Sequence, residues 1–306
     1  MRYLNPFIFF QLIEEPLDNF THVTTKLINS DMRYDTLTKN EEKRIILEIL
    51  KSLEVNNFST TGDKSKWQKG WKEVFNEYSR TKDVSSLSAK FTTTRKEELI
   101  LRLHGEYIHT YNHDFHKNLY TAFHYWAIEK YFKDATEIFD FGCGTGENIK
   151  HIADILPKTK LHGLDWVQES VDIVNLLKTN LDIDATGHQF DFFNPDYSLD
   201  IPEGSAVYTS ESLEQVGSNF RPFLNFLLEK KPSIVVNFEP ILEFYDDTLL
   251  LDYLAIKYHT QRNYLIGYYT ELKKLENNGY IQILKEKRLQ YGGLNHDSSI
   301  IVWKPI

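Results

Sequence analysis

The residues best suited to chemistry gather around a glycine-rich stretch, IFDFGCGTGEN, at positions 138–148. An apolar run there reaches Asp140, passes through glycines at 142, 144 and 146, and opens a segment with helical periodicity. Free amide groups at the start of a helix attract anions, so loops of this form often bind phosphates. The spacing of the glycines then determines which ligand suits the loop.

Neither common phosphate-binding pattern fits this loop. The dinucleotide fingerprint needs a third glycine at the position of Glu147. A carboxylate in the first turn of the helix would repel a dianionic phosphate. The Lys-Ser or Lys-Thr pair of a nucleotide-triphosphate loop does not follow the glycines either. Because Asp140 adds a second acid, the loop favours a ligand of positive character.

Further acidic residues are expected at the ends of other strands. Asp165 follows Gly146 by nineteen residues, and Asp191 and Glu239 close later apolar runs. Ligands of open α/β sheets bind outside the carboxyl ends of the strands. We therefore expect these carboxylates to surround one site. As alternatives, Asp165 could cap the next helix and Asp191 could serve only as a turn residue.

The second half of the chain alternates strand and helix patterns. Short apolar strands are predicted at 137–142, 160–166, 187–193, 205–211 and 233–239. Such alternation predicts a doubly wound parallel sheet with right-handed crossovers. Two further strands, 280–289 and 298–305, lack an intervening helix and predict an antiparallel pair at the sheet edge. The predicted fold class is α/β, with a mostly parallel, seven-stranded sheet.

The first half has mainly helical periodicity. In 41–54, the residues Ile46, Leu50 and Leu53 are predicted to share one face of a helix. The polar stretch 84–96 is interpreted as a linker. We divide the chain into a helical N-terminal accessory region, a lead-in segment that could act as a lid, and a core, at 1–95, 96–134 and 135–306.

Composition narrows the partners and the compartment. The chain has 306 residues and a formal net charge of −9, which argues against a general nucleic-acid surface. The single cysteine, Cys143, cannot form an internal disulfide and is interpreted as a packing residue in a reducing compartment. The apolar run 7–10 is too short to span a membrane. We expect a cytoplasmic protein without a membrane span; a homo-oligomer is compatible with the sequence.

The segment from Asp140 to Gly146, DFGCGTG, resembles the first motif of class I S-adenosylmethionine-dependent methyltransferases. Residues 209–216 (TSESLEQV) are similar to the fourth motif of that family, with Gln215 where many members have His. The resemblance covers about residues 135–306. It implies a Rossmann-like methyltransferase core that uses S-adenosyl-L-methionine as cofactor.

The resemblance also implies roles for single residues. Asp165 is expected to bind the ribose hydroxyls, and Asp191 with Phe192 the adenine. The lead-in segment is expected to close over the cofactor, with Tyr107 or Tyr111 at its methionine end. The implied cofactor-binding residues are Asp140, Gly142, Gly144, Gly146, Asp165, Trp166, Asp191, Phe192, Ser210 and Tyr107.

A predicted helix at 249–265 carries residues expected to handle the acceptor. His259 and Arg262 share a face of this helix, and Glu239 ends the preceding strand. We expect His259 to act as general base, Glu239 to orient it or the acceptor, and Arg262 to hold an anionic or hydroxylated group. Glu214 is a fourth candidate catalytic residue. The alternative is an exposed amphipathic helix whose His and Arg are solvated.

Two weaker patterns concern metals. Glu211 and Glu214 could bind an amine, or a divalent metal that grips a diol, but we assign no metal to the site. His109 and His113 could ligate zinc if their segment were helical. We interpret the surrounding stretch, 104–116, as a polar lead-in.

Four short segments resemble bacterial sugar O-methyltransferases tied to surface-polysaccharide synthesis: 67–73 (WQKGWKE), 213–217 (LEQVG), 239–240 (EP) and 258–265 (YHTQRNYL). This resemblance implies that the acceptor is a sugar or sugar nucleotide and that the reaction is carbohydrate modification. Trp67 and Trp71 would then stack on a sugar face or serve as packing anchors.

Several alternatives stay open. One is N-methylation of a small amine or natural-product intermediate, and another is a non-catalytic cofactor-binding subunit. RNA or protein methylation is a weaker alternative. Residues 194–197 (NPDY) are similar to a signature of adenine amino-methyltransferases, but they follow the third predicted strand and not the fourth, so DNA is disfavoured as a substrate.

Overall fold

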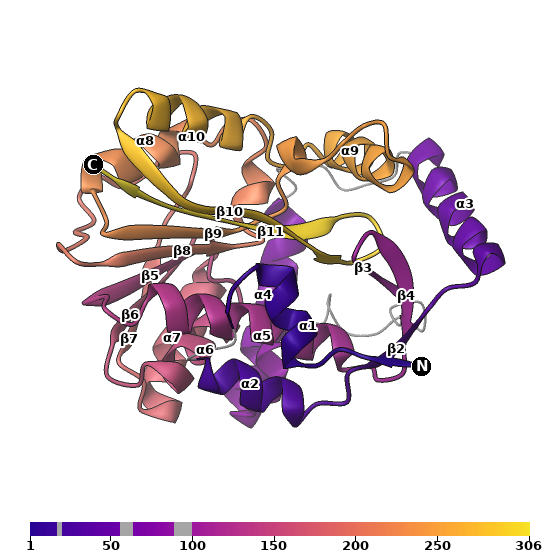
Figure 1. Ribbon diagram of the computed structural model, residues 1–306. Coiled ribbons are helices and arrows are strands. Elements are labelled where there is room, and N and C mark those ends of the chain that lie inside the picture. Colours follow the sequence, from indigo (N-terminus) through magenta and orange to yellow (C-terminus); the bar gives the residue numbers. More distant parts are fainter. Residues whose placement is uncertain (17–19, 56–63, 89–99) are drawn as a thin grey trace.

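The computed structural model describes residues 1–16, 20–55, 64–88 and 100–306. Within these residues, one mixed sheet of eleven strands runs through the molecule (Figure 1). The strand order is β1 (Arg2–Tyr3), β2 (Arg33–Thr36), β4 (Glu106–Thr110), β3 (Ile100–Leu103), β10 (Ile281–Gly292), β11 (Asp297–Pro305), β9 (Ile234–Phe238), β8 (Ala206–Ser210), β5 (Glu137–Phe141), β6 (Lys160–Asp165) and β7 (Ala185–Gln189). The seven strands from β10 to β7 correspond to the predicted ones. The prediction of a seven-stranded sheet is nevertheless wrong, because four N-terminal strands extend it.

Strands β5 to β9 pair in parallel, as predicted. Helices cover both faces of the central strands β5, β8 and β9, which explains why these strands are mostly apolar and buried. Strand β7 ends at Gln189, before the predicted end, because the chain turns at Asp191. The Asp191 carboxylate accepts a hydrogen bond from the amide of Phe193 at 2.9 Å. Asp191 and Phe192 therefore lie in the loop beyond the strand.

Strands β10 and β11 form the predicted antiparallel pair, but the pair is not at the sheet edge. Strand β11 also pairs with β9, and β10 pairs with β3 through Tyr291 and Gly292. The N-terminal strands have two to five residues each, too few to show a clear alternation in the sequence. A zinc site at His109 and His113 would require their segment to be helical. His109 lies in strand β4, so this condition is not met.

Helices pack on both faces of the sheet around two hydrophobic cores. One face carries α1 (Pro6–Ile13), α2 (Thr21–Ile28), α4 (Lys64–Thr81), α5 (Phe115–Tyr131), α6 (Glu147–Ile155) and α7 (Gln168–Leu181). The other face carries α8 (Arg221–Lys230) and α10 (Tyr268–Asn277), while α9 (Leu250–Arg262) packs with α3 (Lys39–Val55) (Figure 1). Short 3-10 turns form at η1 (Val84–Leu87), η3 (Leu213–Val216) and η4 (Leu242–Phe244).

Two predictions for the first half need correction or lie outside the described residues. In α3, Ile49 and Leu53 are buried against Leu254 of α9, whereas Leu50 is 39 % exposed. The predicted face is therefore right for Ile46 and Leu53, which pack in this cluster, and wrong for Leu50. The first residues of the predicted linker form η1, but residues 89–96, with the boundary between 95 and 96, lie outside the described residues.

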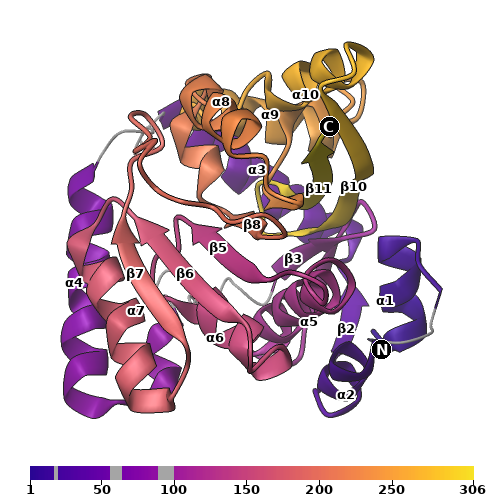
Figure 2. The same ribbon diagram turned by 90° about the vertical axis from the view of Figure 1, so that its left-hand side faces the viewer.

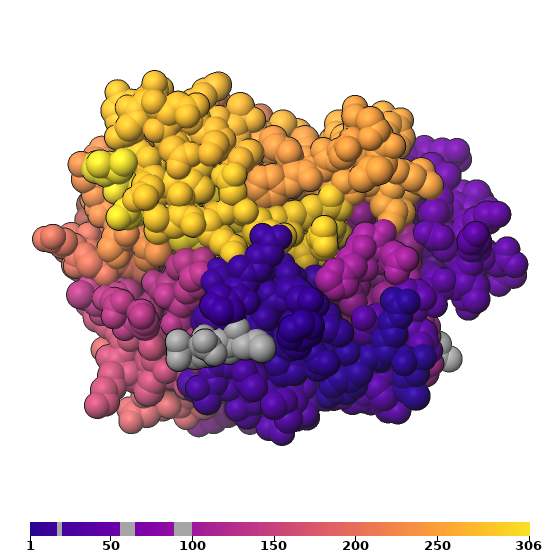
Figure 3. Space-filling model, viewed as in Figure 1, coloured from indigo at the N-terminus to yellow at the C-terminus, as the bar shows by residue number. Residues whose placement is uncertain are grey.

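The N-terminal segment packs directly against the C-terminal strands. Figure 3 shows its indigo residues immediately below the yellow ones on one face of the molecule. Lys285 of β10 donates a hydrogen bond to the carbonyl of Ile13 at 2.7 Å and pairs with Glu15 at 2.9 Å. Lys130 of α5 pairs with the same carboxylate. The two ends of the chain are therefore joined by charged contacts as well as by the shared sheet.

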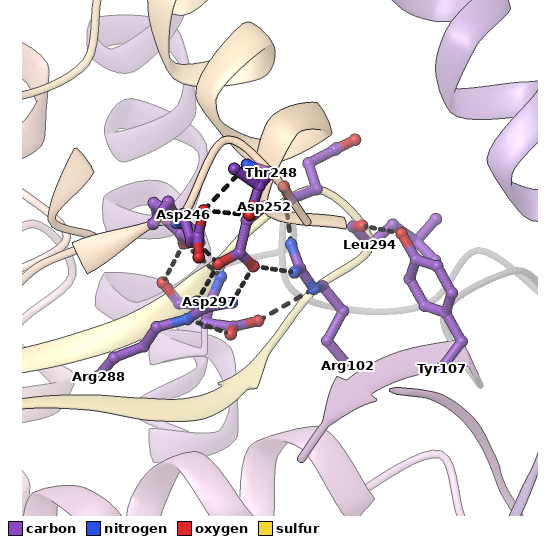
Figure 4. A network of polar contacts seen from close by, with 10 residues as sticks. Arg102, Tyr107, Asp246, Thr248, Asp252, Arg288, Leu294 and Asp297 are labelled. Carbon is purple, nitrogen blue, oxygen red and sulfur yellow. Dashed lines mark hydrogen bonds and ion pairs between the residues drawn. The ribbon is translucent and has the colours of Figure 1, made fainter. Parts of the chain in front are cut away.

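A buried ion network joins the N-terminal strands, the C-terminal hairpin and α9 (Figure 4). Arg102 of β3 lies 3.0 Å from Asp297 of β11 and 3.6 Å from Asp252 of α9. Arg288 of β10 pairs with the same two carboxylates at 2.7 and 2.6 Å. Arg102 and Asp297 are each 1 % exposed. Every charge in the network has an opposite partner, and together they fix where α9 lies against the sheet.

Replacing Arg102 by Met removes one cation from this network. We expect the free energy of unfolding to fall by about 3 kcal/mol, because the buried carboxylates lose a partner. Urea denaturation measures the change. Arg33→Met is the control: the Arg33–Asp31 pair lies at the surface, so its loss should leave the midpoint nearly unchanged. Equal stability of R102M and wild type would contradict a structural role for the network.

Candidate functional site

A cleft opens at the carboxyl ends of β5, β6 and β8. Its empty volume, including space continuous with solvent, is about 730 Å³. The lining residues are Trp67, Trp71, Gly142, Asp165, Trp166, Asp191, Phe192, Phe193, Glu211, Ser212, Gln215 and Val216. Aromatic rings and carboxylates dominate this lining. The cleft therefore suits a flat ring that carries hydroxyl groups or positive charge.

The glycine loop after β5 contributes to the wall of this cleft. Gly142 has a φ of +76°, and a Cβ atom there would lie 2.3 Å from the Cβ atom of Ser212. Only glycine fits such a position. The Ser212 hydroxyl donates a hydrogen bond to the carbonyl of Phe141 at 2.8 Å. The loop conformation thus depends on close contact between the ends of two neighbouring strands.

Asp165 ends β6 and is 5 % exposed. Its carboxylate accepts hydrogen bonds from the amides of Gly144 and Val167, each at 2.9 Å. Val167 is the N-cap of α7, and no side-chain hydrogen bond caps this helix, so Asp165 forms a turn before the helix and does not serve as its cap. Burial raises the pKa of Asp165 to about 6, and the hydrogen bonds from these amides oppose the rise. Each carboxylate oxygen has a second lone pair, which leaves capacity for ligand hydroxyls.

Asp140 lies in β5, two residues before Gly142, and is fully buried. Neither of its carboxylate oxygens has a hydrogen-bond partner. Burial raises the pKa of Asp140 to about 8, with further contributions from Asp165 and Glu239. A buried acid without a partner is costly to ionise. Asp140 is not among the residues that line the cleft, so a cationic ligand bound there would lower this cost through its charge and not by contact with the carboxylate.

Helix α4 packs beside α7 (Figure 2) and contributes Trp67 and Trp71 to the lining of the cleft. Its Trp67 and Trp71 rings lie one helical turn apart, with centroids separated by 5.5 Å. A Cβ atom at Gly144 would lie 3.1 Å from the Trp71 ring, so this ring packs directly on the glycine loop. The two tryptophans, predicted as sugar platforms or packing anchors, share their cleft with Asp165 and Asp191.

Glu239 was expected to orient His259 or the acceptor, but its carboxylate does not contact His259. Its carboxylate accepts hydrogen bonds from the amides of Ser212 at 3.3 Å and of Leu213 and Glu214 at 3.1 Å each. Burial raises the pKa of Glu239 to about 7, while backbone hydrogen bonds oppose that rise. Glu239 therefore holds the start of η3 and fixes the loop that follows β8.

The acceptor residues expected on α9 are only partly brought to the site. His259 is fully buried, with Nε2 3.1 Å from Nδ1 of His296, and does not line the cleft. Burial lowers the pKa of His259 well below its ordinary value. The geometry thus does not support His259 as general base. Arg262 donates a hydrogen bond to the Tyr264 hydroxyl at 2.7 Å. Burial raises the pKa of Glu214 well above its ordinary value, and the charge of Arg262 opposes this rise.

Three other residues differ from their predicted places. Tyr107 is 2 % exposed and donates a hydrogen bond to the carbonyl of Leu294, beside the ion network and away from the cleft lining (Figure 4). Tyr111 bonds Asp35. Ser210 shares a hydrogen bond with Tyr120 at 2.8 Å, next to the cleft but outside its lining. The cover of the cleft therefore comes from α4, and the described part of the lead-in segment does not supply it.

Some lining residues were not assigned from the sequence. Ser212 and Phe193 are examples. Glu211 had been considered with Glu214 as a site for an amine or a metal, and its position directly after β8 fits the rule that ligands bind beyond the carboxyl ends of strands. The contact of Trp71 with the glycine loop gave no signal in the sequence, because it depends on packing between distant parts of the chain.

The described residues contain neither a cluster of metal-binding side chains nor a membrane-spanning helix. Their His, Cys, Asp and Glu side chains form no group of three or more that could hold a metal ion. Their helices include none with the length and apolar character needed to cross a membrane.

Comparisons with known proteins find only distant similarity. No family model and no curated protein matches it. Similar solved structures include a SAM-dependent methyltransferase from Aquifex aeolicus, at 13 % identity over 59 % of this chain and 89 % of that chain, with a TM-score of 0.41. Geranyl diphosphate C-methyltransferase from Streptomyces coelicolor A3(2) is 12 % identical over 64 % of this chain and 85 % of its own, with a TM-score of 0.46. These similarities are too distant to assign an activity, which is inferred from the site.

Asp140→Asn tests the buried carboxylate. The ordinary pKa of 3.8 rises to about 8 on folding, so the folded state binds this proton more tightly and loses stability as pH rises between these values. We expect the stability of D140N to depend less on pH. At pH 8 its free energy of unfolding should exceed that of wild type by up to about 5 kcal/mol. Urea denaturation at several pH values measures it, with the exposed Asp154→Asn as control. Unchanged pH dependence in D140N would contradict this assignment.

Proposed function

We propose that this protein transfers a methyl group from S-adenosyl-L-methionine to a small acceptor molecule. The observation that carries the proposal is the unpartnered, buried carboxylate of Asp140 beside a glycine loop whose helix begins with Glu147. Two acids at this place favour a ligand that carries an ammonium or sulfonium group. They disfavour a pyrophosphate, which needs the helix start free of negative charge.

The cleft offers a partner for each part of such a ligand. Asp165 would accept hydrogen bonds from the ribose hydroxyls, and Asp191 with Phe192 would hold the adenine. The glycine loop would hold the methionine end, with Asp140 acting through its charge. Bound there, S-adenosylmethionine supplies an activated methyl group on a positively charged sulfur. Trp71 of α4 would help to exclude water from the same space.

The acceptor that we propose is a sugar or sugar nucleotide, methylated on a hydroxyl in surface-polysaccharide synthesis. This choice rests on the resemblance of four short segments to sugar O-methyltransferases. Glu211 favours a second candidate, N-methylation of a small amine, because a carboxylate in the cleft attracts a cation. A cofactor-binding subunit without catalysis would have the same cleft, and turnover on any acceptor separates the two.

Calorimetry tests the cofactor assignment without any acceptor. We expect S-adenosylmethionine and S-adenosylhomocysteine to bind, whereas NAD and ATP do not. Asp165→Asn should weaken both adenosyl ligands about tenfold or more, because a buried hydrogen-bond acceptor for the ribose is lost. The exposed Asp184→Asn is the control and should bind as wild type does. Uptake of NAD or ATP in place of the adenosyl ligands would refute the proposal.

Trp71→Ala removes part of the cleft wall. We expect the Kd for S-adenosylhomocysteine to rise about fivefold, since an aromatic contact contributes roughly 1 kcal/mol beyond its buried area. Trp71→Phe keeps a ring and should stay close to wild type. Ligand-dependent quenching of tryptophan fluorescence, compared with calorimetric Kd values, measures the effect. If W71A binds as tightly as wild type, the tryptophan does not contact the ligand.

Labelled methyl donor identifies the acceptor class. Free sugars, sugar nucleotides and small amines are incubated separately with the protein, and products are found by mass spectrometry. A labelled methyl ether of a sugar would support the first candidate, and a labelled amine the second. Binding of the cofactor with no transfer to any compound in the panel would favour the non-catalytic alternative.

A further inference from the structure

Glu211, the residue that follows β8, has an unusual backbone conformation at the cleft. Its φ is +50°, in the left-handed region that residues with a Cβ atom rarely adopt. Its amide donates a hydrogen bond to the carbonyl of Phe238 at the end of β9, at 3.0 Å. Its side chain is exposed within the cleft. The fold therefore holds a carboxylate at this place despite the backbone strain, and such strain is often found at functional sites.

The position of Glu211 along the sheet relates it to the other cleft residues. Strands β7, β6, β5 and β8 are neighbours in that order. The proposed adenine and ribose contacts, Asp191 and Asp165, follow β7 and end β6, and the glycine loop follows β5. A ligand that spans these strand ends presents the next part of its structure toward β8. Glu211 is the cleft carboxylate at that end.

The groups that face Glu211 come from several elements. The hydroxyl of Tyr120 of α5, which shares a hydrogen bond with Ser210, interacts with the carboxylate and lowers its pKa. Tyr208 of β8, Tyr291 of β10 and Glu214 of η3 also interact with its charge. These partners are acidic or neutral, so they do not neutralise the carboxylate. The crowded surroundings desolvate it and raise the pKa of Glu211 to about 7, even though the side chain is exposed within the cleft.

We propose that Glu211 lies at the methyl-transfer point and accepts the proton that the acceptor loses, an inference that rests on the proposed function. The acceptor oxygen or nitrogen bonds to the methyl carbon while the carbon–sulfur bond breaks, and sulfur keeps that electron pair. The proton passes from the acceptor to the Glu211 carboxylate and is released to water afterwards. Tyr120 is a positioning residue that orients this carboxylate.

The same arrangement limits the acceptor. Ionised Glu211 repels phosphate groups near the reacting atom and accommodates a neutral hydroxyl or an amine. If the acceptor is a sugar nucleotide, its diphosphate must therefore lie away from this end of the cleft. The carboxylate also attracts the positive charge that the methyl donor carries at its sulfur.

This attraction provides a test that needs no acceptor. S-adenosylmethionine carries a sulfonium, and sinefungin an ammonium, where S-adenosylhomocysteine has a neutral sulfur. Calorimetry at pH 6, 7 and 8 gives the affinity of each cationic ligand relative to S-adenosylhomocysteine. Asp140 and Asp165 affect the shared parts of all three ligands, so their titration largely cancels in this ratio. We expect the ratio to rise about tenfold with pH in wild type as Glu211 ionises.

Glu211→Gln should make this ratio low and independent of pH, while the affinity for S-adenosylhomocysteine stays near wild type. Glu211→Gly is the second variant, because glycine adopts the left-handed conformation freely and secures folding if the first variant fails. Glu203→Gln, an exposed change before the same strand, is the control. A wild-type ratio in both Glu211 variants would overturn the proposal. Failure of wild type to bind any of the three ligands would instead refute the proposed function itself.

Discussion

Like charge concentrated at the carboxyl ends of parallel strands constrains the whole site. The carboxylates that meet there are Asp140, Asp165, Glu211 and Glu239. Backbone amides compensate Asp165 and Glu239, and the compensation fixes the glycine loop and the start of η3. Asp140 has no such partner. The folded protein therefore carries an electrostatic cost that a cationic ligand would relieve, so stability and ligand selectivity have the same origin.

The N-terminal part of the chain contributes residues that complete this site. Strand β3 brings Arg102 to the two buried aspartates that anchor β11 and α9. Helix α4 brings Trp71 onto the glycine loop from the side of α7. The core strands supply the charges, while this earlier segment supplies the aromatic cover. Removing it would leave the cleft open on one side and leave Asp252 and Asp297 with Arg288 alone as their cationic partner.

The sequence allowed the parallel strands and most of the cleft carboxylates to be predicted, because each follows a short apolar run at a strand end. Asp165 and Asp191 were found in this way. The short N-terminal strands gave no periodic signal, so the extended sheet was missed. His259 was chosen from helical spacing alone, and spacing could not show that its ring lies in the interior beside His296. Glu239 was placed correctly at a strand end, but its hydrogen bonds to the next loop depend on tertiary packing.

Pairing of β10 with β3 has a consequence for association between molecules. A long outer strand would expose a row of free amides and carbonyls, to which another chain could add. Here Tyr291 and Gly292 of the twelve-residue β10 are paired, and the sheet tapers on that side to the two-residue β1. The opposite border, β7, has five residues and a polar sequence, ATGHQ. These short end strands offer few free amides and carbonyls to which another chain could add.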